Sequence, residues 1–494
     1  MKINQLLLFF MLLLGVLDVS GQQQVEMTLA EAQAYAMGHS FAVRYARMDA
    51  ATAAREVKQL TAAGLPHVNG SVEYNNYIDI PTQVAPANAF GFPTYLTQFL
   101  ADVSEETGVP INAPEQDPNA VSEFQFGAPQ TMTAGISATQ LIFDGSYFVG
   151  LQAAKASASA QRSAIEKSEA EVKKATAEAY HTVLISRENL RILEESRSVV
   201  EQSVQETKAL FENGFVEEQD LDQLSLTLAD LDARINYARK QSEISADLLK
   251  FQIGMPLENE IKLSDDIASL TAAPGDAGLL SMGFSLNGNA EYETQNRYVE
   301  LSKLSVKNEK AKGLPSISAF YNYQRNAQRK EFNFLDSDQK WYPIQIWGVK
   351  LSVPIFNSFE GAHRIAKAQI DVERASTALE QIEQGAKLEY LAAKNEFEMA
   401  VENARIQKES RALAERIFNT TQIKYKEGVA SSFELSQAQN QQLNAQGNYI
   451  GAVLQLLNTK ARLNKALNQY WYNPFPWLWK INFPYYLLPL VWSC

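Results

Sequence analysis

The chain has 494 residues, 20% of them charged, and a formal net charge of −13. This acidic balance disfavours nucleic acid as a partner, and no compact basic run reverses it. The only cysteine is Cys494, which excludes a disulfide framework within the chain.

Residues 1–21 have the features of a cleaved secretory signal. Lys2 precedes an apolar stretch from Leu6 to Leu17, and small residues lie just before Gln22. The apolar stretch is too short to cross a bilayer, and no later segment has eighteen uninterrupted apolar residues. The sequence therefore predicts an exported or cell-envelope protein whose mature chain has no transmembrane helix.

The mature chain reads as two copies of one unit, residues 22–256 and 287–470. In both halves the order is helix, Gly-Leu-Pro corner, alternating segment, very long helix, glycine turn and shorter helix. The corners are Gly64-Leu65-Pro66 and Gly313-Leu314-Pro315. Such a duplication argues against three or four unrelated domains. We interpret residues 257–286, between the copies, as a small irregular α/β connection.

The first half opens with a capping-box signature, Thr28 followed by Glu31, and we expect one helix from Thr28 to Ala63. Two proline-free stretches predict very long helices with sevenfold apolar spacing, each followed by a helix about half as long. The predicted long helices span residues 146–210 and 359–425, the shorter ones span 219–253 and 433–468, and the second half opens with a helix over 289–312.

Four segments alternate apolar and polar residues, which predicts strands with one apolar and one polar face. They span residues 67–77, 131–143, 316–323 and 344–356. Their lengths suit a tilted membrane-spanning strand, although a soluble sheet fits the same pattern. Residues 78–129, rich in proline, are predicted to form a long loop on the outside of the cell.

The two glycine turns repeat one motif. Phe211–Leu221 and Tyr425–Leu435 each have an aromatic residue, two polar residues, glycine, and then a carboxylate next to a leucine. Glycine supplies the positive φ that ends a helix and lets the chain turn back. We interpret both segments as the tips of helical hairpins.

Four amphipathic strands cannot close a barrel, because the smallest membrane barrels need eight strands and lipid does not tolerate open sheet edges. The chain is therefore expected to oligomerise. Three copies would give a twelve-stranded β-barrel, continued by a helical tube, with the polar faces lining a water-filled duct.

Residues 28–468 resemble the TolC-like outer-membrane efflux proteins. The resemblance depends on the Thr-Leu-x-x-Ala start at Thr28, the two Gly-Leu-Pro corners, Leu141-Ile-Phe-Asp-Gly145, and the two tips. It implies a mainly α-helical homotrimer in the outer membrane, with a twelve-stranded β-barrel in the lipid and a periplasmic α-helical barrel. It also implies a periplasmic adaptor and an inner-membrane pump as partners, in tripartite efflux or type I secretion.

The resemblance also implies site residues at the tips. Asp220 and Glu434 match carboxylates of a periplasmic gate, and Tyr425 matches an aromatic residue that holds the gate shut. Gln437 stands where a second carboxylate can stand, and Ala430 where some members carry an arginine that ties the gate. The residues Gly214, Gly428 and Phe211 are then tip positions where the adaptor makes contact. From residues alone, the two carboxylates could instead favour helix starts, where negative charge is stabilising.

Other classes of function find little support in the sequence. The four histidines are scattered, and neither a phosphate-binding loop nor a metal-ligand cluster is evident, so we expect no enzyme and no cofactor. The alternative is a structural or adhesive coiled-coil protein of the envelope, which would explain the long helices but not the strands. Residues 471–494, rich in aromatic residues and proline, are interpreted as an irregular tail, or less readily as an interfacial anchor. The transported substrate is not predictable from the sequence.

Overall fold

The structure, a computed structural model, describes residues 25–86, 92–111, 121–125, 127–271 and 276–471. The predicted signal peptide and all of the predicted tail beyond residue 471 lie outside these residues. The chain forms two compact units, a helical unit of residues 1–57, 152–306 and 366–494, and a strand unit of residues 58–151 and 307–365. Within the described residues, no helix is both long and apolar enough to cross a membrane.

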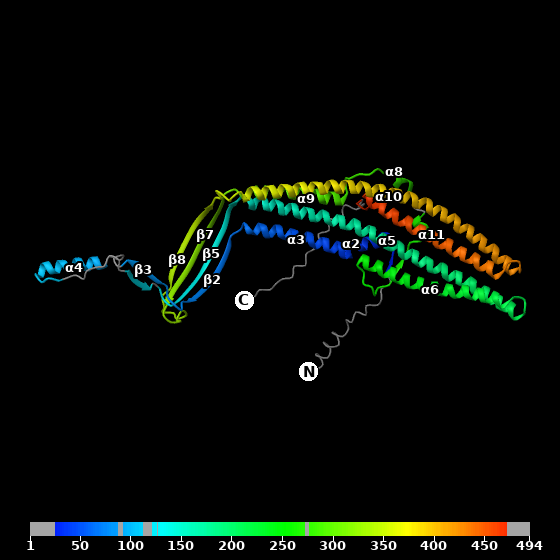
Figure 1. Cartoon of the computed structure of the whole chain (residues 1–494), viewed down its shortest axis with the longest axis horizontal. Coiled ribbons are helices and arrows are strands. Elements are labelled where there is room, and N and C mark those ends of the chain that lie inside the picture. The colour runs from blue at the N-terminus through cyan, green and yellow to red at the C-terminus, as the bar shows by residue number, and fades with distance from the viewer. Residues whose placement is uncertain (1–24, 87–91, 112–120, 126, 272–275, 472–494) are drawn as a thin grey trace, which may run out of the picture. The chain divides into compact units, whose positions relative to one another are not determined.

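The strand unit is built on one four-stranded antiparallel sheet in the order β2-β5-β7-β8 (Figure 1). The strands are β2 (His67–Asn76), β5 (Gln130–Asp144), β7 (Ser316–Arg329) and β8 (Tyr342–Ser352). All four overlap the predicted strands, and β7 extends six residues beyond its prediction. The sheet therefore combines two strands from each sequence repeat.

The register gives the sheet one apolar and one polar face, because residues paired across antiparallel strands point to the same side. Val68, Ala138, Tyr321 and Trp347 form one row of the apolar face. Asn69, Ser137 and Asn322 belong to a row of the opposite face. The predicted amphipathic character is thus present over β2, β5 and β7, whereas β8 places Ile344 and Ile346 on the otherwise polar face.

The segment 78–129, predicted to be a long loop, contains regular elements in its described part. Strand β3 (Thr82–Pro86) pairs with β4 (Val121–Gln125), and α4 (Phe92–Thr107) lies between them in the chain. The prolines led to the wrong prediction, since Pro86 ends a strand and Pro93 falls in the first turn of a helix, two positions that proline tolerates.

The helical unit contains two hairpins of one long and one shorter helix. The first is α5 (Gly145–Glu212) with α6 (Glu218–Ile253), and the second is α10 (Glu360–Lys426) with α11 (Ser432–Ala466). Both long helices begin in the strand unit, and the second repeat opens with α9 (Ala290–Ala311). The ends of these helices agree with the predictions within about two residues, the usual uncertainty of helix boundaries.

The predicted single helix from Thr28 to Ala63 is wrong, because it is divided into α2 (Leu29–His39) and α3 (Phe41–Ala63). The predicted Thr28–Glu31 capping box is present at the start of α2. At the break, Ser40 has extended backbone angles and its hydroxyl accepts a hydrogen bond from the Val43 N–H at 3.4 Å. Ser40 therefore caps a new helix.

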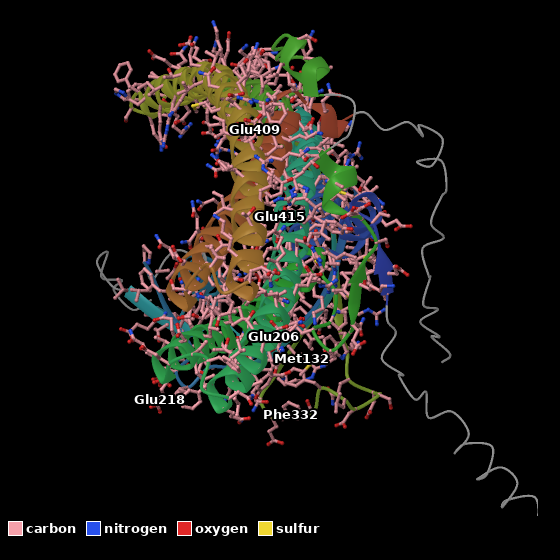
Figure 2. The ribbon with its side chains drawn as sticks, turned by 90° about the vertical axis from the view of Figure 1, so that its right-hand side faces the viewer. Met132, Glu206, Glu218, Phe332, Glu409 and Glu415 are labelled. Atoms are coloured by element: carbon pink, nitrogen blue, oxygen red, sulfur yellow. The ribbon has the colours of Figure 1, made fainter. Side chains whose placement is uncertain are left out.

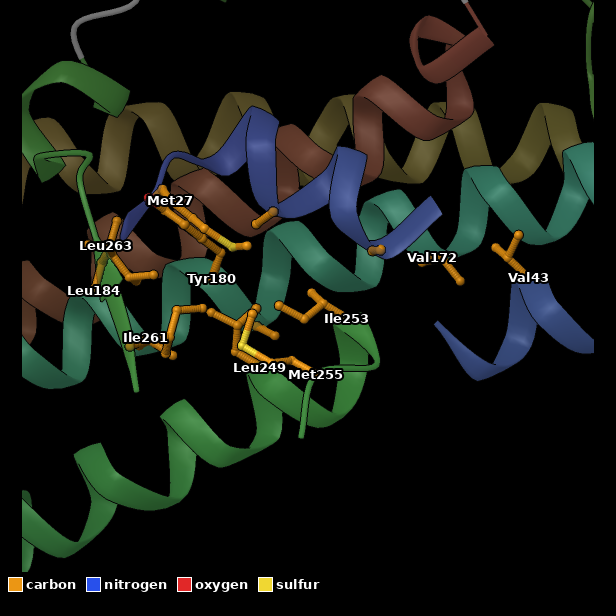
Figure 3. Close-up of a cluster of buried hydrophobic side chains, with 14 residues drawn as sticks. Met27, Val43, Val172, Tyr180, Leu184, Leu249, Ile253, Met255, Ile261 and Leu263 are labelled. Atoms are coloured by element: carbon orange, nitrogen blue, oxygen red, sulfur yellow. The ribbon is translucent and has the colours of Figure 1, made fainter. Parts of the chain in front are cut away.

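The connection between the repeats contains β6 (Ile261–Leu263), α7 (Ile267–Thr271) and α8 (Asp276–Ser281). Strand β6 pairs in parallel with β1 (Val25–Met27). Figure 3 shows the buried cluster beneath this pair, where Met27, Leu263 and Leu249 pack around Tyr180 of α5. The Tyr180 hydroxyl lies 2.9 Å from Asp265 Oδ2 and 3.0 Å from the Met27 carbonyl oxygen.

Separate buried clusters fix the lateral order of the helices. One joins α5 to α6 around Leu231, one joins α5 to α11 around Val453, and one joins α10 to α11 around Phe397. In Figure 1 the order is α6, α5, α11, α10, with α6 and α10 on the outside. Helix α6 also contacts α11, through Leu443 and the Thr227–Ser436 hydroxyl pair. At the tips, a further cluster contains residues of all four helices.

Candidate functional site at the helical tips

Both hairpin tips end their long helix with the same backbone motif. In the first, the Phe215 N–H donates to the Leu210 carbonyl and the Gly214 N–H to the Phe211 carbonyl, both at 2.9 Å. In the second tip, Val429 and Gly428 make the corresponding bonds at 2.8 and 3.0 Å. These pairs define Schellman motifs, which require a left-handed residue. Gly214 and Gly428 provide it, with φ of 78° and 71°.

The returning helices both begin with a carboxylate three residues after the cap. In α11, the Ser431 N–H donates to Glu434 Oε2 at 2.8 Å, and the Glu434 N–H donates to Ser431 Oγ at 3.2 Å. In α6, the Glu217 N–H donates more weakly to Asp220 Oδ2 at 3.4 Å. The two predicted gate carboxylates therefore stabilise helix starts, as the simpler interpretation expected.

Three of the polar contacts that join the first hairpin to the second lie close to the turns. The Ser432 hydroxyl donates to Asp220 Oδ1 at 2.5 Å, and the hydroxyl oxygens of Thr207 and Tyr425 lie 2.6 Å apart. A third contact pairs Lys426 with Glu206, labelled in Figure 2, at 3.3 Å. Asp220 and Tyr425 thus do more than solvate or pack, because each links two helices that are more than 200 residues apart in sequence.

Beneath these contacts lies a cluster of Leu224, Phe418, Leu435 and Ala438, against which Val199 of α5 packs, so that all four helices contribute. Its next layer is polar: Thr227 Oγ1 lies 3.3 Å from Ser436 Oγ, and Gln439 is 2% exposed. Both amide atoms of Gln439 are buried without a hydrogen-bond partner in the described structure. A buried polar group without a partner costs free energy, so the tips are packed less favourably than a purely apolar bundle.

Two tip residues have shifted pKa values. The Ser431 backbone and side-chain hydrogen bonds lower the pKa of Glu434, an exposed residue that is therefore ionised at neutral pH. Burial raises the pKa of Tyr425, which keeps the phenol protonated and able to form a hydrogen bond with the Thr207 hydroxyl. The Ser431–Glu434 and Thr207–Tyr425 contacts are therefore intact at neutral pH.

The remaining predicted residues lie on the surface of the tips. Phe211 is 37% exposed, Gln437 is exposed on α11, and Ala430 lies in the turn with its N–H 3.2 Å from the Lys424 carbonyl oxygen. Space is open around both tip glycines, since a Cβ there would meet no atom within 4 Å. Sequence reasoning missed Thr207 and Ser432, whose only sequence signal is a hydroxyl close to the glycine turn.

Within the described residues, no group of three or more His, Cys, Asp or Glu side chains is arranged to hold a metal ion. Asp220 and Glu434 are paired with hydroxyl and backbone groups instead. The arrangement supports helix capping and contacts between hairpins.

The fold is similar to those of solved outer-membrane channels. The CmeC outer membrane channel of Campylobacter jejuni has 17% identity and a TM-score of 0.64, over 89% of this chain and 85% of that one. The open state of the MtrE outer membrane channel of Neisseria gonorrhoeae has 14% identity and a TM-score of 0.63, over 89% of this chain and 88% of that one. The outer membrane protein VceC of Vibrio cholerae has 13% identity and a TM-score of 0.61, over 89% of this chain and 96% of that one. The long hairpins and the amphipathic sheet thus form the fold of an outer-membrane channel.

Sequence comparison defines the family. The outer membrane efflux protein family matches residues 116–254, which belong to the first repeat, and residues 290–469, which make up most of the second. The chain belongs to this family. A comparison with curated proteins gives no match.

Membership confirms the predicted resemblance, the duplicated mainly helical fold and the outer-membrane location with a periplasmic extension. The protein is an outer-membrane exit duct for efflux, in a family of channels rather than enzymes. Nothing found supports the alternative of a structural or adhesive coiled-coil protein.

Proposed function

We propose that three copies of the chain form the duct, with a twelve-stranded β-barrel and an α-helical barrel, and that a periplasmic adaptor and an inner-membrane pump deliver substrate to it. The observation that carries this proposal is that each unit has two different unpaired edges. Such edges suit head-to-tail contacts between identical copies, which generate a closed ring when the rotation closes.

In the strand unit the free edges are β2 and β8. Successive neighbours in the sheet are antiparallel, so β2 and β8 run in opposite directions. When β8 of one copy lies beside β2 of the next, the pair is antiparallel and the ring continues the pattern of the sheet. Closure places the polar face inside and the apolar face in lipid, as membrane barrels require.

In the helical unit the free edges are α6 and α10. Each carries exposed apolar residues at sevenfold spacing: Tyr237, Ile244 and Phe251 on α6, and Met399, Ile406 and Leu413 on α10. Sevenfold apolar stripes are typical of helices that pack against another helix. We therefore assign α6 of one copy to pack against α10 of the next.

Cysteine cross-linking tests this ring. The helices run in opposite directions, so Tyr237 and Ile406, about equally far from their glycine turns, would meet across the interface. With Cys494 replaced by serine, Tyr237→Cys with Ile406→Cys should give covalent dimers and trimers on oxidation. Arg239→Cys with Ile406→Cys is the control, because Arg239 lies away from the stripe. Equal cross-linking of both pairs, or none in either, would contradict the assignment.

We further propose that the joined tips are the periplasmic gate and that Gly214, Gly428 and Phe211 contact the adaptor. The Ser432–Asp220 and Thr207–Tyr425 contacts support a closed state in which the two hairpins are held together. Glu434 and Gln437 are exposed and so available to the duct. Three copies would place three Glu434 carboxylates near the opening, a ring that favours cations.

A further inference from the structure

The apolar face of the sheet contains two arginines, Arg325 and Arg329. Arg329 donates to the carbonyl oxygens of Gln328 and Lys340 and lies over the Phe334 ring, so its guanidinium has partners within the protein. Arg325 of β7 is in register with Ala134 of β5 and Pro343 of β8, so it points to the same side as Tyr321 and Tyr323. Its Nε donates to the Tyr323 hydroxyl at 3.0 Å. Among the described residues, no carboxylate forms an ion pair with it. An unpaired guanidinium on a lipid-facing surface is costly unless it reaches a headgroup.

A shallow hollow of 510 Å³ lies beside this guanidinium on the same face. Its lining includes Gly70, Ala134, Ile136, Tyr323 and Trp341 as well as Arg325. The hollow exists because Gly70 and Ala134 are small where their neighbours are large. Its lining is mostly apolar, and Arg325 is the only charged residue in it.

Aromatic residues mark the end of the sheet at which Arg325 lies. Phe334, 2% exposed, packs against Tyr74 and Phe332 at 5.9 and 5.6 Å and against Trp341 at 6.4 Å, measured between ring centroids. The turn between β7 and β8 contributes three of these rings. Belts of aromatic residues are typical of the boundary between hydrocarbon and headgroups in membrane barrels. Arg325 lies in the next row of this face after the row that contains Tyr74 and Met132, on the side toward the middle of the sheet. It is then within reach of headgroup phosphates.

We propose that Arg325 and this hollow bind a phosphate-bearing lipid of the outer membrane. The phosphate accepts hydrogen bonds from the guanidinium that Tyr323 orients, and one acyl chain fills the hollow over Gly70 and Ala134. Arginine and phosphate form strong charge-assisted hydrogen bonds, which makes this pairing specific. The proposal rests on the proposed function, in that the apolar face must lie in a bilayer.

Native mass spectrometry of the full chain in detergent tests the site. The probes are dioleoylphosphatidylglycerol, dioleoylglycerol with the same chains but no phosphate, and inorganic phosphate. Wild type should retain phosphatidylglycerol in preference to dioleoylglycerol, and Arg325→Gln should reduce this retention about tenfold, as loss of a charge-assisted contact does. Arg325→Lys should keep part of it. Lys350→Gln, which removes a cation from the polar face of the same sheet, should have no effect.

The hollow is tested separately with Gly70→Leu. A Cβ at Gly70 would meet only the Gly135 carbonyl oxygen, at 4.0 Å, so the larger side chain fits and fills the space. It should lower retention of both lipids.

Equal retention by wild type and Arg325→Gln would overturn the proposal, as would displacement of the lipid by inorganic phosphate. The same spectra report the number of copies in the assembly. A monomer that retains the lipid would contradict the proposed ring but not the lipid site. A trimer that does not retain the lipid would contradict the lipid site but not the ring.

Discussion

The Ser432 hydroxyl donates to the Asp220 carboxylate at 2.5 Å, and this contact joins the first turn of α11 to the first turn of α6. Asp220 also accepts a hydrogen bond from the Glu217 N–H within its own helix. One side chain therefore caps a helix and holds two hairpins together. A change that affects only the second role should loosen the tips without unfolding them.

Ser432→Ala is such a change, because it removes the donor and leaves Asp220 able to cap α6. We expect a higher open probability in planar bilayers. A double-mutant cycle of Ser432→Ala with Asp220→Ala, measured on the free energy of unfolding, should show a coupling of about 1.5–3 kcal/mol. This is the range for a hydrogen bond to a charged group. Asn440→Ala, at an exposed position two turns along α11, is the matched control. Additive effects of Ser432→Ala and Asp220→Ala would show that the contact contributes nothing.

The two tip carboxylates should differ in their effect on cations. Glu434 is exposed and ionised, whereas Asp220 is half-buried and bound to Ser432. We expect Glu434→Gln to weaken block by multivalent cations several-fold, and Asp220→Asn to raise open probability with less effect on block. The measurement is single-channel current with divalent or trivalent cations on the periplasmic side. If Asp220→Asn weakened block as strongly as Glu434→Gln, both carboxylates would line the duct.

The tip glycines should be required for their backbone conformation rather than for space. Gly214→Ala and Gly428→Ala create no clash but place a Cβ at positive φ, which costs roughly 1–2 kcal/mol. Each variant should lower the thermal unfolding midpoint, and asparagine should be better tolerated than alanine. Gly447→Ala, in the interior of α11 where space is open, should instead stabilise by about 0.5–1 kcal/mol. A tip variant as stable as Gly447→Ala would refute the conformational role.

The sequence predicted the elements whose signal is local. Proline-free apolar repeats indicated the helices, alternation indicated the strands, and glycine indicated the turns. The Ser431-x-x-Glu434 capping box also has a local signature, although the gate interpretation of Glu434 obscured it. The break at Ser40 was missed, although Gly38, two residues before it, is a local signal that a helix can end there.

The contacts that join the hairpins could not be predicted in this way. Thr207 and Tyr425 are 218 residues apart, and only the packing of α5 against α10 brings their hydroxyl groups together. The Arg325 site has the same origin, since Gly70, Ala134 and Arg325 come from three strands and meet only through the register of the sheet. Sites assembled from distant segments require the fold before they can be recognised.

His181 is buried on α5, with Nδ1 3.1 Å from Asn458 Oδ1. Burial is the main cause that lowers its pKa to about 4, and nearby Lys460 adds to it, while Asn458 and Asp265 act in the opposite direction. The unfolded chain takes up this proton near pH 6.5. Stability is therefore full above about pH 6.5 and is lost progressively as the pH falls toward 4, by about 3 kcal/mol in total.

His181→Asn removes this titration but retains a polar side chain, so the difference in unfolding free energy between wild type and variant should shrink as the pH falls from 7 to 4. Urea unfolding of both proteins at several pH values measures it, and the many carboxylates titrate equally in the two. A difference that stays constant over this range would mean that His181 does not become protonated on unfolding, either because it is already charged in the fold or because it remains neutral in both states.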